Sequence, residues 1–498
     1  MRATAFARLL TPLLLLTLNG CLLGPDYVRP KVDVPATFRF SMEETADTAN
    51  TAWWEQFEDP VLNDLITAAL ADNLDVKIAA ARVEEFRGQF VTTRSGLFPQ
   101  VGANFGASRQ RASQDGSVPL PAGVNPVFNE FDASVSASWE IDLFGKIRRE
   151  TEAARANLLA SEEGRRGTIL TLVASVASSY INLRSLDRQL DIAKATAESR
   201  ADSVKVFTLR FQGGEVSQME LAQSQSEYQA ALATIPQLEA QIAVQEDAIA
   251  VLLGRNPEPI LRGRELDALA PPAIPAGLPS DLIARRPDLL EAEQNLVAQN
   301  ALIGAARALY FPSISLTGLF GSLSTDFSNL FTGPARVWSF AGAVSVPIFT
   351  AGNIEGQVRQ AEARQQEALL AYRKAIQVAF QEVADALITA QKSREQLNVQ
   401  ADQVTALSTY AHLARLRYEG GYTSYIEVLD AERSLFNAQL VYAQTQGTEL
   451  SSFVSLYKAM GGGWVVKAEQ MTQPQAQPPQ PPAPAQPVAA LPASEAQR

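Results

Sequence analysis

The sequence contains only one cysteine and one histidine among its 498 residues. One cysteine cannot form a disulfide within the chain, and the two residues together are too few for a Cys/His zinc site. A phosphate-binding glycine loop is also missing. The single histidine, His412, lies between Tyr410 and Leu413 in a long helical pattern, which is typical of a surface or seam position. The sequence therefore predicts a protein that is not an enzyme and that binds no metal or cofactor.

Basic residues are outnumbered by acidic ones, with 42 lysines and arginines against 54 aspartates and glutamates. The formal net charge at pH 7 is -12, and the lysines and arginines form no basic stripe of the kind that binds nucleic acid. Beyond the N-terminal segment, no stretch approaches the ~18–20 uninterrupted apolar residues of a membrane-spanning helix. A chain with these properties would cross a membrane only as β-strands.

The N-terminal segment, residues 1–20, has the composition of a signal peptide, with two arginines followed by an apolar run. The four residues that end at Cys21 resemble the bacterial lipobox, in which the cysteine becomes the lipidated first residue of the mature protein. Because Cys21 has no disulfide partner, acylation explains its position; an ordinary secretory signal with an incidental cysteine is the alternative. Leu22 stands where an aspartate would resemble an inner-membrane retention signal, which favours the outer membrane.

A long internal duplication sets the expected architecture. Gly420-Gly421 and Gly213-Gly214 have an arginine and an aromatic residue before them, and a serine and a glutamate after them, at the same positions. The two pairs are 207 residues apart (420 minus 213). Each stretch is typical of a helix that stops at glycines, where a positive φ is needed, and restarts at a Thr/Ser cap. We therefore predict two repeats whose glycine turns are the tips of long antiparallel helical hairpins.

Composition and duplication together give the expected boundaries. A proline-containing arm precedes the repeats, a proline-rich linker separates them at mid-height, and a compositionally disordered Ala/Pro/Gln-rich tail follows them. The predicted segments are the signal peptide at 1–20, the lipid-anchored arm at 21–60, the first repeat at 61–253, the linker at 254–280, the second repeat at 281–464 and the tail at 465–498.

Each repeat is expected to begin with one helix, at 61–97 and again at 281–310. After the strands, a seven-residue apolar step predicts coiled-coil helices that run from Lys146 and Asn353 to the glycine tips. These helices have roughly 65 residues and would reach ~100 Å. The returning helices are shorter, so the helices before the strands are expected to stack on them end to end.

Two-residue periodicity after each Phe-Pro predicts two strands per repeat. The stretch from Asp132 to Asp142 alternates polar and apolar residues without an error. Each strand has about ten residues, the length that a tilted strand needs to cross a bilayer core. Four strands cannot close a barrel, and exposed backbone edges are not tolerated in lipid, so two or more copies must share one barrel. The alternative is a soluble β-sandwich whose outer face is exposed to water.

These features resemble the TolC-type outer-membrane efflux ducts, in particular their OprM/NodT lipoprotein branch. The resemblance covers nearly the whole mature chain, and its most specific parts are Cys21, Arg-Pro-Asp at 286–288, Val-Pro-Ile-Phe at 346–349 and the two Gly-Gly tips. It implies a mixed α/β membrane protein and a homotrimer, in which three chains of four strands share one twelve-stranded barrel that a coiled-coil helical tunnel continues. It also implies a periplasmic adaptor (membrane fusion) protein and an inner-membrane pump, usually of the proton-driven RND type.

In this family, acidic rings beside an apolar residue narrow the periplasmic mouth of the tunnel. The matching positions here are Ile426, Glu427 and Asp430, and the two acids lie three residues apart on one helix face. Repeated around a threefold axis, they would form stacked negative rings that favour cations. Alternatively, they are acids stabilised by the helix dipole. In the first repeat Glu220 matches Glu427, but Gln223 replaces the aspartate.

Polar contacts between neighbouring hairpins latch the tips in this family. The matching positions are Tyr418 and Glu220, whereas Thr423 stands where some members have a basic residue, which leaves the latch contacts open. The expected tip residues for latching and adaptor docking are Glu220, Tyr418, Gly213, Gly214, Gly420 and Gly421.

The predicted function is a passive outer-membrane duct for drugs or other small molecules, closed at rest by the second hairpin and opened by adaptor docking. Metal-ion efflux and type I protein secretion are alternatives; the five methionines do not cluster and give no support to copper or silver transport. A lipid-anchored periplasmic scaffold without a pore is the alternative from a different class.

Overall fold

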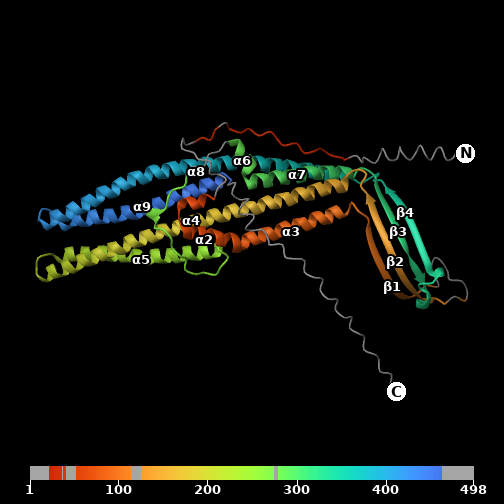
Figure 1. The fold of residues 1–498 in the computed structure, drawn as a ribbon, viewed down its shortest axis with the longest axis horizontal. Coiled ribbons are helices and arrows are strands. Elements are labelled where there is room, and N and C mark those ends of the chain that lie inside the picture. The colour runs from red at the N-terminus through yellow and green to blue at the C-terminus, as the bar shows by residue number, and fades with distance from the viewer. Residues whose placement is uncertain are drawn as a thin grey trace, which may run out of the picture.

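The computed structural model describes residues 22–35, 37–40, 52–113, 123, 125–273 and 279–461. Cys21, the predicted signal peptide and the predicted tail lie outside these residues. A four-stranded sheet forms one end of an elongated molecule, and the turns of two helical hairpins form the other end (Figure 1). Long helices connect the two ends, which agrees with the predicted mixed α/β fold.

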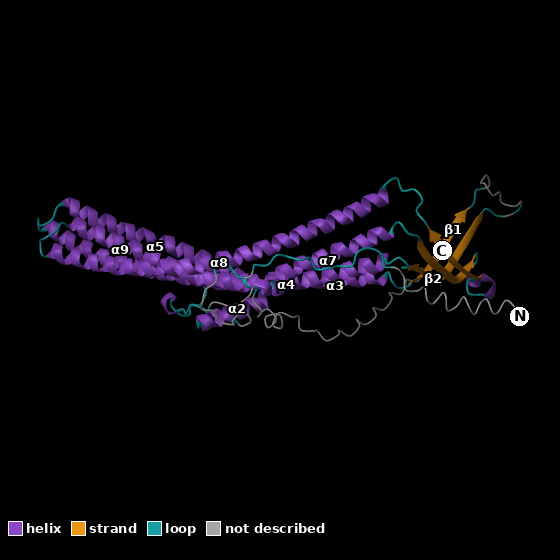
Figure 2. Cartoon of the chain, turned by 90° about the horizontal axis from the view of Figure 1, so that it is seen from above, coloured by secondary structure: helices purple, strands orange, loops and turns teal. Residues whose placement is uncertain are grey.

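The elements follow one another in the order that the duplication predicts. The long helices α4 and α8 run from the sheet end to the tips, and the shorter α5 and α9 return beside them (Figure 2). The helices and strands are η1 (Trp53–Phe57), α2 (Pro60–Asp72), α3 (Leu74–Ser95), β1 (Gln100–Arg111), β2 (Val127–Ile141), α4 (Lys146–Gln212), α5 (Gln218–Leu252), η2 (Leu266–Ala268), α6 (Pro279–Arg285), α7 (Pro287–Ala308), β3 (Ser313–Ser324), η3 (Phe327–Asn329), η4 (Gly333–Ala335), β4 (Arg336–Ser345), α8 (Asn353–Glu419) and α9 (Tyr425–Ala459).

Element bounds repeat along the chain at two fixed spacings. Adding 213 to the bounds of α3 and β1 gives the bounds of α7 and β3. Adding 207 to the bounds of α4 and α5 gives the bounds of α8 and α9. The difference of six residues (213 minus 207) arises between the strands of each pair, where the second repeat is shorter. The predicted internal repeat is therefore confirmed, and the ends of these four helix and strand pairs agree to the residue, whereas β4 (10 residues) is shorter than β2 (15 residues).

The helix before each strand pair is interrupted, so the prediction of one continuous helix is wrong in both repeats. Asn73 separates α2 from α3, and Arg286 separates α6 from α7. The Asn73 side chain caps α3 by accepting a hydrogen bond from the Val76 N–H at 3.0 Å. Pro287, the first residue of α7, has no N–H with which to continue a preceding helix. A capping asparagine and a proline thus end helices that apolar periodicity alone would join.

The residues at these two breaks also hold the returning helices α5 and α9 in place, end to end with α3 and α7. Asn73 Nδ2 donates to the carbonyl of Leu252 at the end of α5, at 2.9 Å. Arg286 Nη1 donates to the carbonyl of Ala459 at the end of α9, at 3.0 Å. Each bond satisfies a carbonyl that the last turn of a helix leaves without an intrahelical partner. Since Leu252 and Ala459 are also 207 residues apart, different side chains make the same contact in the two repeats.

A buried polar network at mid-height joins the connection between the repeats to the helices. Asp59 is fully buried, and its Oδ2 accepts hydrogen bonds from the Tyr180 hydroxyl at 2.8 Å and the Arg264 N–H at 2.9 Å. The Tyr180 hydroxyl accepts in turn from the Gly263 N–H at 2.8 Å. Burial, followed by the hydrogen bond to Asp59, raises the pKa of Tyr180 above its usual value. The described part of the connection is therefore fixed against α2 and α4.

All strands pair antiparallel in the order β1-β2-β3-β4, and their register gathers the apolar residues on one face. Phe105 and Phe340 on this face are 78% and 80% exposed in the single chain. On the opposite face, Asn104 donates to the Asp132 carboxylate at 2.5 Å. No second layer covers the apolar face within the described residues, so the soluble-sandwich alternative lacks the second layer it needs. The apolar face contains Val101, Ala103, Phe105, Val135, Ala137, Trp139, Ile314, Leu316, Phe320, Trp338, Phe340 and Val344.

One described helix, α4, is long and apolar enough to cross a membrane by length and composition. However, 72% of its most apolar window is buried inside the chain. This helix is at the centre of the main hydrophobic cluster, with Ile169, Val176 and Leu183 fully buried. Its apolar character therefore belongs to the helical core.

Both glycine turns end their helices with the same pair of hydrogen bonds, a Schellman motif. After α8, the Tyr422 N–H donates to the Arg417 carbonyl at 2.8 Å, and the Gly421 N–H donates to the Tyr418 carbonyl at 2.9 Å. The equivalent bonds after α4 run from Glu215 to Arg210 and from Gly214 to Phe211.

Only the second glycine of each pair has a positive φ, at +77° for Gly214 and +75° for Gly421. The φ angles of Gly213 and Gly420 are helical, at -80° and -77°. The expectation that each pair as a whole needs positive φ is therefore wrong for the first glycine. Gly420 has a steric reason instead, because an added Cβ would lie 2.8 Å from the Tyr422 ring.

Replacing Arg286 by alanine is expected to lower the free energy of unfolding by about 1–3 kcal/mol, because the carbonyl of Ala459 loses its hydrogen bond. The control is Arg307→Ala, which removes an exposed ion pair with Glu362 (2.8 Å) and is expected to cost below about 1 kcal/mol. Thermal unfolding of the detergent-solubilised protein measures both. Equal losses in the two variants would contradict the role given to Arg286.

Replacing Gly421 by alanine is expected to destabilise the second tip by about 1 kcal/mol, because a residue with a Cβ is strained at positive φ. Gly213→Ala is the matched control, since its φ is helical and the nearest atom to an added Cβ is 3.6 Å away. Amide hydrogen exchange at residues 415–430 should accelerate in the first variant, while exchange at the first tip should not accelerate in the control. Similar acceleration in both would show that the first glycine also needs its freedom.

Candidate gate at the tips of the helical hairpins

An aromatic cluster holds the two hairpin tips of one chain together. The ring of Phe207 in α4 lies 4.0 Å from that of Tyr425 in α9 and 6.1 Å from that of Tyr418 in α8, measured between centroids. Val428 and Ala431 of α9 are buried in the same cluster. The apolar side of the first turns of α9 therefore faces the first hairpin, and Tyr418, predicted as a latch residue, packs within its own chain.

Glu220, the other predicted latch residue, is engaged within its own hairpin. The Ser217 N–H donates to Glu220 Oε2 at 2.8 Å, and the Glu220 N–H donates to Ser217 Oγ at 3.3 Å. This reciprocal pair is a capping box at the start of α5. The predicted side-chain cap is thus present in the first repeat.

Glu427, the equivalent residue of the second repeat, makes different contacts. Its Oε1 accepts from Arg417 Nη1 at 3.1 Å, and its Oε2 accepts from the Thr423 hydroxyl. Ser424 occupies the N-cap position of α9, as the predicted Thr/Ser cap requires, but its side chain makes no capping hydrogen bond. Thr423 stands where the first repeat has Val216, and the added hydroxyl binds the carboxylate that a capping box would use.

Ile426 and Asp430 lie one turn apart on the side of α9 that points away from the buried Val428 and Ala431. The Ile426 side chain is 60% exposed. The Asp430 carboxylate pairs with Arg433 at 2.8 Å. Both predicted gate acids therefore have an arginine partner on their own hairpin, which reduces the net negative charge at this position.

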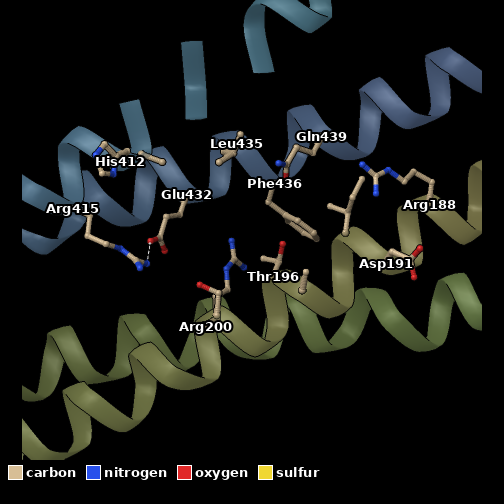
Figure 3. A pocket seen from close by; sticks show the side chains of 14 residues that line it. Arg188, Asp191, Thr196, Arg200, His412, Arg415, Glu432, Leu435, Phe436 and Gln439 are labelled. Carbon is tan, nitrogen blue, oxygen red and sulfur yellow. Dashed lines mark hydrogen bonds and ion pairs between the residues drawn. The ribbon is translucent and has the colours of Figure 1, made fainter. Parts of the chain in front are cut away.

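A cavity of about 560 Å³ separates the two hairpins farther from the tips (Figure 3). Arg200 of α4 extends toward it and is 5% exposed, with Nη1 donating to the Glu227 carbonyl at 2.6 Å. The Arg200 guanidinium lies 5.3 Å from the Phe436 ring centre. Burial lowers the pKa of Arg200, and the carboxylate of Glu227 opposes this shift. His412, on α8, is exposed at the edge of the same cavity.

Sequence reasoning missed Arg200 and the pair Arg415–Glu432, which joins α8 to α9 beside this cavity. The signal for Arg200 was present in the sequence, because the apolar residues Ala193 and Phe207 flank it at seven-residue steps. Both of these residues are buried in the structure. An arginine inside an apolar seven-residue seam indicates a buried charge with a specific partner. No comparable pattern points to Arg415 or Glu432.

Comparisons with known proteins agree with this architecture. The chain matches the sequence profile of the family described as outer membrane efflux protein over residues 65–255 and 278–462. It is 37% identical over 464 residues to the probable efflux pump outer membrane protein TtgC of Pseudomonas putida, covering 92% of this chain and 95% of that protein. It is 36% identical over 454 residues to the cation efflux system protein CusC of Escherichia coli, covering 90% and 97%.

Solved structures give the same result. A crystal structure of CusC matches with a TM-score of 0.79 and 34% identity, over 89% of this chain and 100% of that one. The open state of the MtrE outer membrane channel of Neisseria gonorrhoeae matches with a TM-score of 0.80 and 33% identity, over 89% and 99%. Both segments matched by the family profile include a strand pair and a hairpin tip. The chain therefore belongs to the outer membrane efflux protein family.

Proposed function

We propose that this outer-membrane efflux channel is the passive exit duct of a tripartite system that carries small molecules across the periplasm and the outer membrane. The sheet is the observation that carries this proposal. Its four strands share one exposed apolar face, and the strands at its two edges, β1 and β4, have no partner within the described residues. A bilayer around the sheet would cover that face, and a pore requires the edges to be joined to further strands.

Three copies would close such a barrel. Membrane barrels need about eight strands or more, so one chain with four is too small. We infer a homotrimer with twelve strands, in which α3, α4, α7 and α8 of each copy continue the barrel as a helical tunnel. The relatives support this reading, since the CusC structure concerns transmembrane channel formation and MtrE is described as an outer membrane channel.

We also propose that Cys21 carries the lipid anchor and begins the 21–60 arm. The first described residues of the arm support this, because they lie on α4 next to the sheet. Arg149, near the start of α4, donates to the Leu23 carbonyl at 2.9 Å and pairs with Asp26 at 2.8 Å. An acyl chain on the residue before Leu22 would therefore enter the same membrane as the strands.

For the gate, we propose that Ile426, Glu427 and Asp430 of the three copies line the periplasmic constriction. Ile426 and Asp430 lie on the side of α9 away from the aromatic cluster, which supports this assignment because that side is free of the neighbouring hairpin of the same chain. Glu427 lies beside that side and is partly buried. The Arg417–Glu427 pair joins the last turn of α8 to the first turn of α9. The tip would consequently move as one piece.

The proposed partners are a periplasmic adaptor (membrane fusion) protein and an inner-membrane pump of the proton-driven RND type. The tip residues Glu220, Tyr418, Gly213, Gly214, Gly420 and Gly421 are the proposed region for latching and adaptor docking. Drug-like molecules are the proposed cargo. Metal-ion efflux is the second candidate, because identity to the cation efflux protein CusC (36%) nearly equals identity to TtgC (37%).

Replacing both Glu427 and Asp430 by alanine is expected to raise single-channel conductance in planar bilayers by about twofold or more and to reduce cation selectivity. Two larger, charged side chains would leave the constriction of each copy, together with their pairs to Arg417 and Arg433. Conductance and reversal potential in a salt gradient measure the two effects.

Glu258→Ala is the matched control, because Glu258 pairs with Arg255 three residues away on the exposed connection after α5, far from the tips and outside the proposed tunnel wall. This control should conduct like the unchanged protein. If the double variant also kept both its conductance and its selectivity, these acids would not belong to the gate.

A further inference from the structure

A groove without charged residues lies beside α4, between the two hairpins. Its volume is about 750 Å³, and α4, α5 and α9 line it. The helix α4 lies between α5 and α9 and contacts both (Figure 1). Although 19% of the chain's residues are charged, none of the described residues that line this groove is charged. We call it the amide groove, because six of its side chains are carboxamides: Asn182, Gln189, Gln237, Gln241, Gln245 and Gln444.

The amide groove lies on the side of α4 that faces away from the connection between the repeats. Tyr180 accepts a hydrogen bond from a backbone N–H of that connection at 2.8 Å, and Arg184 donates to the Arg264 carbonyl at 2.8 Å. Asn182 and Leu186 of the groove each follow one of these α4 residues by two positions, which is about 200° around a helix. In the proposed tunnel the connection must lie outside, since it would otherwise fill the lumen. The amide groove therefore faces the lumen.

The proposed constriction lies on the same side of α9 as the amide groove. Leu440 and Gln444 of the groove follow Ile426 and Asp430 by 14 residues each. Fourteen residues are two heptads, which keep a side chain on the same face of a coiled coil. At 1.5 Å per residue the groove lies ~21 Å from the constriction along the lumen. Cargo that passes the constriction meets the amide groove next.

Three of the carboxamides are available to bind a ligand. The side chains of Gln237, Gln241 and Gln444 are exposed and have no hydrogen-bond partner within the part of the chain that the structure describes. Asn182 Nδ2 donates to Gln245 Oε1 at 2.8 Å, which orients both of these side chains. Each carboxamide without a partner offers an NH₂ donor and a carbonyl acceptor.

Apolar side chains line the amide groove between the carboxamides. Leu186 and Leu238 are buried, Leu440 is half-buried and Val244 is exposed. The groove thus combines apolar surface with neutral donors and acceptors. Its volume lies within the ~300–1,000 Å³ that is usual for sites that bind small molecules.

We propose that the amide groove is a transient binding site for cargo, and that it takes uncharged, drug-sized organic molecules that carry both hydrogen-bond donors and acceptors. This proposal rests on the proposed duct and narrows its cargo. A carboxamide can donate to a carbonyl of such a molecule and accept from its hydroxyl or amide groups. The leucines of the groove cover the apolar part of the same molecule.

Weak binding of this kind suits a passive duct. A neutral hydrogen bond contributes little net free energy, because water offers the same bonds to both partners when they are apart. No charged residue among those described in the groove adds a Coulomb attraction. Conduction requires sites that a molecule both enters and leaves readily. The composition of the amide groove meets that requirement.

The same composition makes the amide groove a poor site for metal ions. Soft ions such as Cu(I) prefer thiolate and thioether ligands, and hard divalent cations prefer carboxylates. The described residues that line the groove include no cysteine, methionine, aspartate or glutamate. The groove therefore favours drug-like cargo over the alternative of metal-ion efflux.

Ion current through the full-length protein in planar bilayers tests this site. The probe is chloramphenicol, which is uncharged and carries an amide, hydroxyl groups and an aromatic ring. At millimolar concentrations it should reduce the current in a saturable manner. Replacing both Gln241 and Gln444 by leucine removes two carboxamides per copy at similar side-chain size, and should raise the half-blocking concentration by about fivefold or more.

The matched control is Gln225→Leu/Gln439→Leu. Gln225 lies 16 residues before Gln241 on α5, and Gln439 lies five residues before Gln444 on α9. Their side chains consequently lie roughly 160° and 140° away from the groove around their helices. Gln439 lines the cavity of Figure 3 instead. Chloramphenicol should block this control at the same concentrations as the unchanged protein.

Thiol labelling gives a second measurement that does not depend on current. Ala240 lines the groove and is exposed, so Ala240→Cys should react with a neutral maleimide. At twice the half-blocking concentration, chloramphenicol should slow this reaction by about threefold, because about a third of the sites stay empty. Labelling of Gln225→Cys should not slow, and the unmodified chain, which keeps Cys21, gives the background.

The outcomes separate the cargo site from the duct. A block that only the groove variant weakens, together with protection of Ala240→Cys, supports the site. If the protein conducts but chloramphenicol neither blocks nor protects, or if both double variants weaken the block alike, the site is overturned and the proposed duct stands. If the unmodified protein does not conduct, the proposed duct fails and the cargo site fails with it.

Discussion

The backbone hydrogen bonds at the edges of the sheet are the constraint on which the rest of the structure depends. In lipid, an unpaired N–H or C=O costs several kcal/mol, and β1 and β4 each present a row of them. The apolar residues of all four strands lie on one face, so burying that face in a membrane and joining those edges are requirements of the same sheet. The chain cannot satisfy both alone, and for this reason its quaternary structure follows from its secondary structure.

The duplication conserves geometry more strictly than chemistry. Asn73 and Arg286 differ in size and charge, yet both donate to the last carbonyls of a returning helix at 2.9 and 3.0 Å. Conservation of a contact by different side chains indicates that the end-to-end stacking of helices at mid-height is what both repeats need. At the tips the residue type is kept and the contact differs. Glu220 and Glu427 are equivalent glutamates, but Glu220 accepts from the Ser217 N–H and Glu427 accepts from Arg417.

Much of the fold was predictable because periodicity and glycine turns are local signals. The spacing between the glycine pairs predicted two hairpins, and the ends of α8 and α9 fall where those of α4 and α5 require. The breaks at Asn73 and Arg286 were missed because apolar periodicity continues across them, although a capping asparagine and Pro287 mark them locally. The bonds that these two residues make to the ends of α5 and α9 join positions more than 170 residues apart, and no local pattern specifies them. The positions of the two turns were predicted, but the arginine partners of Glu427 and Asp430 were not, because side-chain pairing around a turn depends on rotamers that no sequence pattern specifies.

The different caps of the two tips also bear on the proposed opening of the second hairpin. The first tip has a complete capping box, whereas Ser424 makes no side-chain cap, and such a cap contributes about 1 kcal/mol. The start of α9 is instead held by Thr423 and Arg417, on the same hairpin. Between the hairpins, Phe207 packs on Tyr418 and Tyr425. Outward movement of the second hairpin would have to separate these rings or take α4 with it, so the aromatic cluster, rather than the acids, resists opening within one chain.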